Sequence, residues 1–250
     1  MDVTISLVPE VITEIGGFPI TNSFFMTIVV SSIVIIGTLI FHKKKDSVPR
    51  GFQNFAESIL EALLNLVDGV TGDRVQTRKF FPIVATIFIF VIISNWIGLL
   101  PGMGTIGFNQ IHHGEEVFVS IIRSPSADLN TTAALAIIAV IAAQMMGITA
   151  IGVKKYAGKF FVSPFKKPYF IGMFVGVLEI ISEFAKIISF SFRLFGNVFA
   201  GEVLLLVMLA LIPLFVPLPF LFLEVFVGFI QALVFAMLTL VFFKMATEAH

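Results

Sequence analysis

The sequence has no cysteine and little charge. Without cysteine the chain can form neither disulfide bonds nor thiolate metal sites. Only 13% of its 250 residues are charged and 58% are hydrophobic, whereas a typical soluble domain has about 25% charged and about 45–50% apolar residues. A soluble fold of this length could not bury so much apolar surface, so we expect a protein whose main solvent is lipid.

Several other features are missing. The formal net charge is zero, which gives no reason to expect a nucleic-acid partner. The first residues lack the basic stretch of a cleavable signal peptide. Internal repeats, which would indicate an inverted-repeat transporter, are absent, as are the HExxH and GxSxG motifs of hydrolases. We predict no cofactor and no metal site, because the histidines do not have the spacing of zinc ligands: His42, His112, His113 and His250.

Long uncharged runs are what the sequence has instead. Runs over 20–41, 80–100 and 131–153 are long enough to span a bilayer as helices. Two further helical segments, 170–211 and 220–246, carry charged residues and are separated by a turn with Pro213, Pro217 and Pro219. These five segments predict an all-α, polytopic membrane protein, with residues 1–250 forming a single membrane domain.

The segment 50–72 has a different pattern. Its apolar residues recur every three or four positions, and Glu57, Glu61 and Asp68 fall between them. This spacing predicts an amphipathic helix that lies on the membrane surface and does not cross it.

The basic residues indicate the orientation of the chain. They cluster at 42–50, 74–79 and 154–167, which the positive-inside rule places in the cytoplasm. The loop 101–130 has one arginine and no lysine, so it is expected outside. Five crossings then place the N-terminus outside and the C-terminus in the cytoplasm.

Charged residues within a membrane helix point to function, because each costs roughly 2.5–3.5 kcal/mol on insertion scales. Helical phasing of 179–202 places most of its polar residues on one stripe, with Ser182 and Ser189 on the edge. Glu202 lies on another face. The stripe consists of Glu179, Glu183, Lys186, Phe190, Arg193 and Asn197.

The last helix repeats this arrangement, because Glu224, Gly228, Gln231 and Phe235 share one face. If the proline-rich turn folds this helix back antiparallel, Gln231 approaches Arg193 and Glu224 approaches Glu202. A glutamine can hydrogen-bond a guanidinium without neutralising it. Two neighbouring carboxylates can share a proton, and in a wet cavity such a pair serves as a proton relay.

Simpler interpretations remain for these residues. Glu179, Glu183 and Lys186 are also compatible with a solvated face near the cytoplasmic end of the helix. Glu202 is compatible with a structural carboxylate. Snorkelling of Arg193 to an interface is disfavoured, because apolar sequence extends at least two helical turns to either side of it.

The stretch SFRLFGNVFAGE, residues 191–202, resembles the signature of the F-type ATP synthase a subunit. The segments 94–101 (SNWIGLLP) and 125–130 (PSADLN), and Gln231 within IQALVFAMLTL, match the same family. The resemblance covers nearly the whole chain after about residue 20, and the loop 102–124 is its least familiar part.

This resemblance implies a set of partners and roles. In that family the a subunit stands beside a rotating ring of c subunits, is accompanied by the b-subunit peripheral stalk, and supplies two offset aqueous half-channels. It also implies that the last two helices lie tilted along the ring. Arg193 matches the essential arginine of the family, and Asn197 and Gln231 match residues beside it. Glu202 and Glu224 match the pair that lines the outer half-channel, and Asp128 and Asn130 match residues at its mouth. Glu179, Ser182 and Ser189 match the path to the cytoplasm.

We therefore expect a non-catalytic, ion-translocating subunit of a bacterial inner (plasma) membrane ATP synthase. Some family members have histidine where this chain has Glu224, so the relay here contains no imidazole. A stand-alone ion transporter or channel is the competing hypothesis. Either proton or sodium is compatible with the sequence, because the surroundings of the ring carboxylate belong to another chain.

Overall fold

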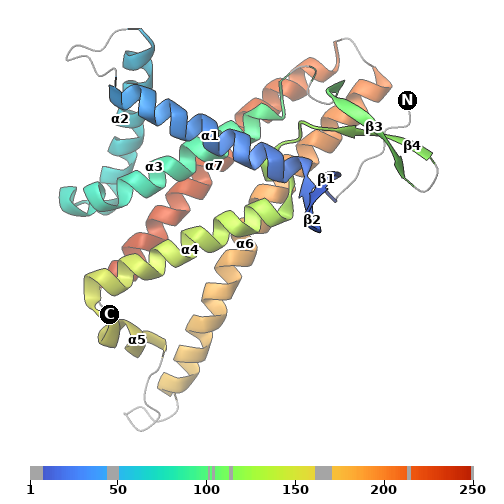
Figure 1. Cartoon of the computed structure of the whole chain (residues 1–250). Helices are drawn as coiled ribbons and strands as arrows, with labels where there is room; N and C mark the ends of the chain where they lie inside the picture. The colour runs from blue at the N-terminus through green and yellow to red at the C-terminus, as the bar shows by residue number, and fades with distance from the viewer. Residues whose placement is uncertain are drawn as a thin grey trace.

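The computed structural model describes residues 8–43, 51–100, 102, 105–112, 115–160, 171–212 and 215–248. Within these residues the chain forms seven α-helices and two β-hairpins (Figure 1). Five helices are long and apolar enough to cross a membrane, which confirms the predicted all-α, polytopic fold. These five are α1 (Asn22–Lys43), α3 (Arg74–Ile97), α4 (Leu129–Ile151), α6 (Ile171–Leu211) and α7 (Pro217–Thr247).

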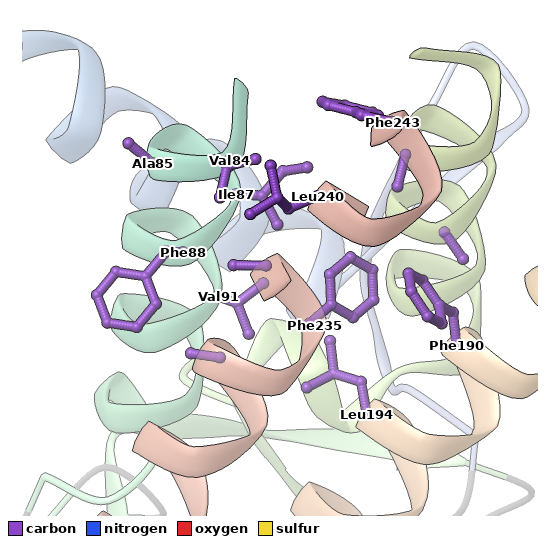
Figure 2. Packing of buried hydrophobic residues seen from close by; sticks show 14 of the residues in the cluster. Val84, Ala85, Ile87, Phe88, Val91, Phe190, Leu194, Phe235, Leu240 and Phe243 are labelled. Atoms are coloured by element: carbon purple, nitrogen blue, oxygen red, sulfur yellow. The ribbon is translucent and has the colours of Figure 1, made fainter. Parts of the chain in front are cut away.

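Helix α7 lies at the centre of the bundle and packs against α3, α4 and α6. Figure 2 shows side chains of α3 and α6 meeting those of α7 in one apolar cluster. The ring of Phe243 lies 5.5 Å from that of Phe80 on α3, and the ring of Phe235 lies 4.7 Å from that of Phe190 on α6. Aromatic contacts of this kind stabilise the packing beyond simple area burial.

Two contacts define the register of α6 and α7. Phe190 packs on Phe235 near the middle of the pair, and Gly201 lies against Glu224 nearer the end where α6 stops and α7 begins. The step from Phe190 to Gly201 along α6 equals the step from Phe235 back to Glu224 along α7. The two helices are therefore antiparallel, as the sequence predicts for a chain reversal at the proline-rich turn.

The predicted amphipathic segment forms helix α2 (Phe52–Thr71). Leu63 and Val67 are buried in the core, whereas Phe55 and Leu66 are exposed. Part of the apolar face of α2 thus remains available to the membrane surface.

Most helix ends differ from the predicted ones by one to six residues, and three of these differences have a clear local reason. Helix α3 begins earlier, because the Asp73 side chain accepts a hydrogen bond from the Val75 amide and caps the helix. Helix α4 ends at Ile151, because the following Gly152 has a φ of 88°, a positive value that glycine adopts without steric strain. The short helix α5 (Val153–Phe160) follows. Helix α7 begins at Pro217, since proline is tolerated in a first turn that needs no amide donors.

The two hairpins were not expected from the sequence. The first pairs β1 (Val11–Ile15) with β2 (Phe18–Thr21) through Gly16 and Gly17, both with positive φ. Such a two-residue glycine turn matches the twist of a hairpin. The second pairs β3 (Gly107–His112) with β4 (Glu115–Ser120) in the loop predicted to lie outside. Both hairpins lie at the same end of the bundle (Figure 1).

Some predicted features lie outside the described residues. They include Pro101, His113, Pro213 and His250, and five of the basic positions that indicate orientation: Lys44, Lys45, Arg50, Lys166 and Lys167. The other basic cluster, at 74–79, lies in the first turns of α3.

Candidate functional site

Glu202 on α6 and Glu224 on α7 line one small cavity at the end of the bundle near the hairpins. This cavity holds roughly one water molecule. Glu224 is buried, with 8% of its surface exposed, and its carboxyl group lies against the backbone of Gly201. The absence of a side chain at Gly201 therefore gives Glu224 its place beside α6.

Helix α3 forms the opposite wall of this cavity. The Asn95 amide nitrogen donates to the Gly228 carbonyl at 2.9 Å, and the Trp96 indole donates to the Val225 carbonyl at 3.0 Å. These bonds attach α3 to α7 within one turn of Glu224. Asn95 Oδ1 is a buried acceptor without a hydrogen-bond partner, and Asn95 lines the cavity together with both carboxyl groups.

The loop that precedes α4 contributes an arginine that was not selected from the sequence. Arg123 Nε lies 3.7 Å from Glu202 Oε2, and both side chains are largely buried. The following residue, Ser124, lines the cavity and donates its hydroxyl to the Ser94 carbonyl at 2.8 Å. The one sequence signal for Arg123 is that it is the only arginine in the loop 101–130, which contains no lysine.

Asp128 and Asn130 lie at the start of α4. Asp128 is buried and accepts a hydrogen bond from the Asn130 amide at 2.9 Å, so it caps this helix. It follows the 3₁₀ turn η2 (Pro125–Ala127), which contacts α6. The side chain of Asn130 is exposed.

Arg193 has an environment unlike that of Glu202 on the same helix. Its side chain is exposed, and Nη2 donates to Ser189 Oγ at 3.2 Å. Asn197 donates to the Arg193 carbonyl at 2.8 Å. The guanidinium carbon lies 5.8 Å from the centre of the Phe190 ring, near the outer limit of a cation–π contact. The register of α6 and α7 places Gln231 within about one residue of the level of Arg193.

The residues of the polar stripe predicted for α6 do not share one environment in the structure. Phe190 is buried against α7, whereas Ser182, Ser189 and Arg193 are exposed, and Glu179 is half-buried. This division follows from the width of the stripe, because its residues drift around the helix at spacings of three and four.

Glu183 and Lys186 do not form a solvated face. Lys186 Nζ donates to Glu183 Oε1 at 2.7 Å, and 17% and 16% of the two side chains are exposed. They line a second small cavity with Gln144 of α4 and Phe242 of α7, and Lys186 Nζ lies 5.0 Å from the centre of the Phe242 ring.

Tyr156 of α5 belongs to the same region. Its hydroxyl donates to Gln144 Oε1. Burial, with smaller contributions from the charges of Glu183 and Glu179, raises the pKa of Tyr156 from 10.0 to about 12. The phenol therefore stays neutral and acts as a donor at physiological pH. Among the described residues, no group of three acidic or histidine side chains is placed to hold a metal ion.

The fold and the site together define a polytopic α-helical membrane protein with carboxyl groups enclosed between its last two helices. Residues 23–244 match the family model described as ATP synthase A chain. The chain belongs to this family.

Individual relatives agree. The chain is 36% identical to the ATP synthase subunit a of Campylobacter jejuni subsp. doylei, with 91% of each protein covered. It is 35% identical to the chloroplastic ATP synthase subunit a of Stigeoclonium helveticum over 95% of this chain and 89% of the relative. It is 31% identical to the ATP synthase subunit a of Moorella thermoacetica over 97% of this chain and 98% of the relative.

Proposed function

We propose that this chain is the proton-translocating a subunit of an F-type ATP synthase, and that it supplies two half-channels which load and unload protons on the carboxyl groups of a c-subunit ring. The observation that carries this proposal is that the ionisable residues of α6 lie in two separate environments. Glu202 and Glu224 share a cavity at one end, and Arg193 is exposed on another part of the same helix.

The outer half-channel delivers protons through the Glu202–Glu224 pair. A proton that arrives from outside is held between the two carboxyl groups and passes to the ring. Once neutral, the ring carboxyl enters lipid at a far smaller cost than an ionised one. Asp128 and Asn130 lie toward the mouth of this half-channel, where Asp128 caps α4 and the preceding turn η2 contacts α6.

Arg193 separates the two half-channels electrostatically. Its guanidinium stays protonated and cannot relay the proton itself. An exposed arginine on an apolar helix requires a partner, and the ionised ring carboxylate is that partner. Ser189 and Asn197 position the arginine, and Gln231 completes its polar surroundings. Protons leave toward the cytoplasm along Glu179, Ser182 and Ser189.

The membrane potential does work on the proton that crosses the membrane, whereas the charge of Arg193 stays in place. Each elementary charge that crosses the membrane gains about 2.3 kcal/mol per 100 mV. Because Arg193 blocks direct passage, the proton completes its path only by riding on the ring, and the ring must turn. In this proposal the chain is a non-catalytic subunit, which couples proton flow to ATP synthesis elsewhere in the complex.

The membrane location, the orientation and the neighbouring subunits of the chain follow from the same proposal. The chain lies in the inner (plasma) membrane with its N-terminus outside and its C-terminus in the cytoplasm. Helices α6 and α7 lie tilted along the c-ring, and the b-subunit stalk holds the chain against rotation. Lipid covers apolar surface elsewhere, such as α1, of which Ile35 is 59% exposed.

The test is proton-driven ATP synthesis by the reconstituted complex carrying Arg193→Ala. We expect the variant to copurify with the c-ring and stalk and to lose coupled synthesis. Arg74→Gln, which removes an exposed arginine paired with Asp68 at 3.0 Å, is the matched control and should keep synthesis. Normal synthesis by Arg193→Ala would refute the proposal, and purification without any c-ring would favour a stand-alone transporter.

A further inference from the structure

Arg123 is held in a fixed position between the outer hairpins and α6. Besides its contact with Glu202, its Nη1 atom donates to the Val8 carbonyl at 3.3 Å. Only 13% of the side chain is exposed. The guanidinium thus lies where the N-terminal segment, the outer loop and α6 meet.

The backbone around Arg123 is fixed by bonds between the two hairpins. Ser120 donates its amide to Glu10 Oε2 at 3.2 Å and accepts from the Asn22 side chain at 3.0 Å. Gln110 donates to the Ile12 carbonyl at 3.2 Å. On the other side of Arg123, the Ser124 hydroxyl bond to α3 anchors the loop. Because the chain is anchored on both sides of Arg123, the guanidinium has a defined position relative to Glu202.

A fixed guanidinium beside a carboxylate occupies the place where a metal cation would bind. Arginine keeps its charge at every physiological pH, and a positive residue in a pore repels other cations electrostatically. A proton does not need that place, since it can move along hydrogen bonds between water and carboxyl groups. The charged groups that meet here are Arg123, Glu202, Glu224 and, through the hairpin, Glu10.

We propose that Arg123 is a specificity-determining residue of the outer half-channel, which keeps sodium ions away from the Glu202–Glu224 pair while protons pass. The proposal rests on the function proposed above and adds a selective step to it. Specificity is then set in part by this chain, and not by the ring carboxylate alone.

The test uses the complete ATP synthase complex in liposomes, with the outer face of the chain toward the lumen. The lumen contains a graded series of sodium chloride, with choline chloride keeping the ionic strength constant. ATP synthesis is driven by an imposed pH difference and potential. Wild type, Arg123→Gln, Arg123→Lys and the matched control Arg74→Gln are compared.

We expect lumenal sodium to leave wild type, Arg123→Lys and Arg74→Gln unaffected, because each keeps a cation beside Glu202. Arg123→Gln should be inhibited by lumenal sodium. Its half-inhibiting sodium concentration should lie roughly tenfold or more below any concentration that inhibits the wild type, because the variant lacks the positive charge that repels sodium from Glu202. Arg123→Met, which keeps the apolar stem, provides the same test if the glutamine variant does not assemble.

Three results would overturn the proposal. Arg123→Gln could synthesise ATP with the same indifference to sodium as wild type. Both uncharged variants could fail to assemble while Arg123→Lys assembles, which would make Arg123 a structural tie. Wild type could require lumenal sodium for synthesis. The first two results leave the proposed function untouched, whereas the third would also contradict its choice of the proton. The Arg193→Ala experiment tests the role of this chain in the synthase independently of Arg123.

Discussion

The carboxyl group of Glu224 occupies the space in which any side chain at position 201 would begin. Two residues that are far apart in the sequence are thus fitted to each other across the α6–α7 interface. Glycine at position 201 is required here for the close approach and not for backbone freedom, because Gly201 lies within a helix.

Gly201→Ala tests this contact. The added methyl group must displace the flexible end of Glu224, so assembly is expected to survive while the carboxyl pair is misplaced. A displacement of about 1 Å can lower a rate roughly a hundredfold, and we expect proton-driven synthesis to fall by about tenfold or more. Gly37→Ala is the control, because a Cβ at Gly37 meets nothing within 4 Å. Wild-type synthesis by Gly201→Ala would show that the position of Glu224 is not critical.

Asn95 and Ser94 give a second pair of contrasting variants. Asn95→Leu removes the bond to the Gly228 carbonyl and the acceptor that faces the cavity. We expect a loss of about 1–3 kcal/mol in the free energy of unfolding, together with slower synthesis. Ser94→Ala removes a buried hydroxyl oxygen that has no partner, so the free energy of unfolding should change by less than about 1 kcal/mol.

Unfolding in mixed micelles, followed by circular dichroism, measures both changes. Equal losses for the two variants would mean that the bond from Asn95 to α7 has no special weight. Synthesis by the reconstituted complex then separates a structural effect from an effect on proton delivery.

The sequence contains enough information to predict the membrane helices and the antiparallel last pair. Long uncharged runs have few alternatives in lipid, because every backbone group must be satisfied within the segment. The intramembrane charges Arg193, Glu202 and Glu224 are conspicuous for the same reason. The hairpins were missed, because strands of four to six residues outside the membrane give a weak pattern. The Gly16–Gly17 pair was the available signal.

The contacts of the site could not be predicted in the same way. The pairing of Arg123 with Glu202 joins a loop to a helix, and no local pattern links them. The fit of Gly201 to Glu224 depends on the register of α6 and α7, in which a shift of one residue would turn the carboxyl group away. The division of the α6 stripe depends on which neighbours cover which face.

For the Glu183–Lys186 pair, removing one charge should destabilise the fold more than removing both. Removing one member of a largely buried pair leaves the other charge uncompensated, and this costs up to about 3–5 kcal/mol. Here both side chains keep some exposure, so we expect Glu183→Gln to lower the free energy of unfolding by about 2 kcal/mol. The double variant Glu183→Gln/Lys186→Met should recover most of this loss.

The more exposed pair of Lys244 with Glu248, at 3.9 Å, is the control. Glu248→Gln should change the free energy of unfolding by less than about 1 kcal/mol. If the Glu183/Lys186 double variant were no more stable than Glu183→Gln alone, the uncompensated charge would not be the cause of the loss.

Tyr156 should show an elevated titration. Its pKa is about 12 in the folded chain, because burial and then the charges of Glu183 and Glu179 disfavour the phenolate. Between pH 10 and pH 12 the unfolded chain releases this proton and the folded chain keeps it, so stability is full below pH 10 and falls as pH rises through this window. Tyr169→Phe leaves Tyr156 as the only tyrosine, and the absorbance of the phenolate then reports its titration. Glu183→Gln in that background should move the midpoint down toward 10, by less than the full shift because burial is the larger cause. A midpoint that starts near 10 would mean that α5 does not bury this phenol against α4.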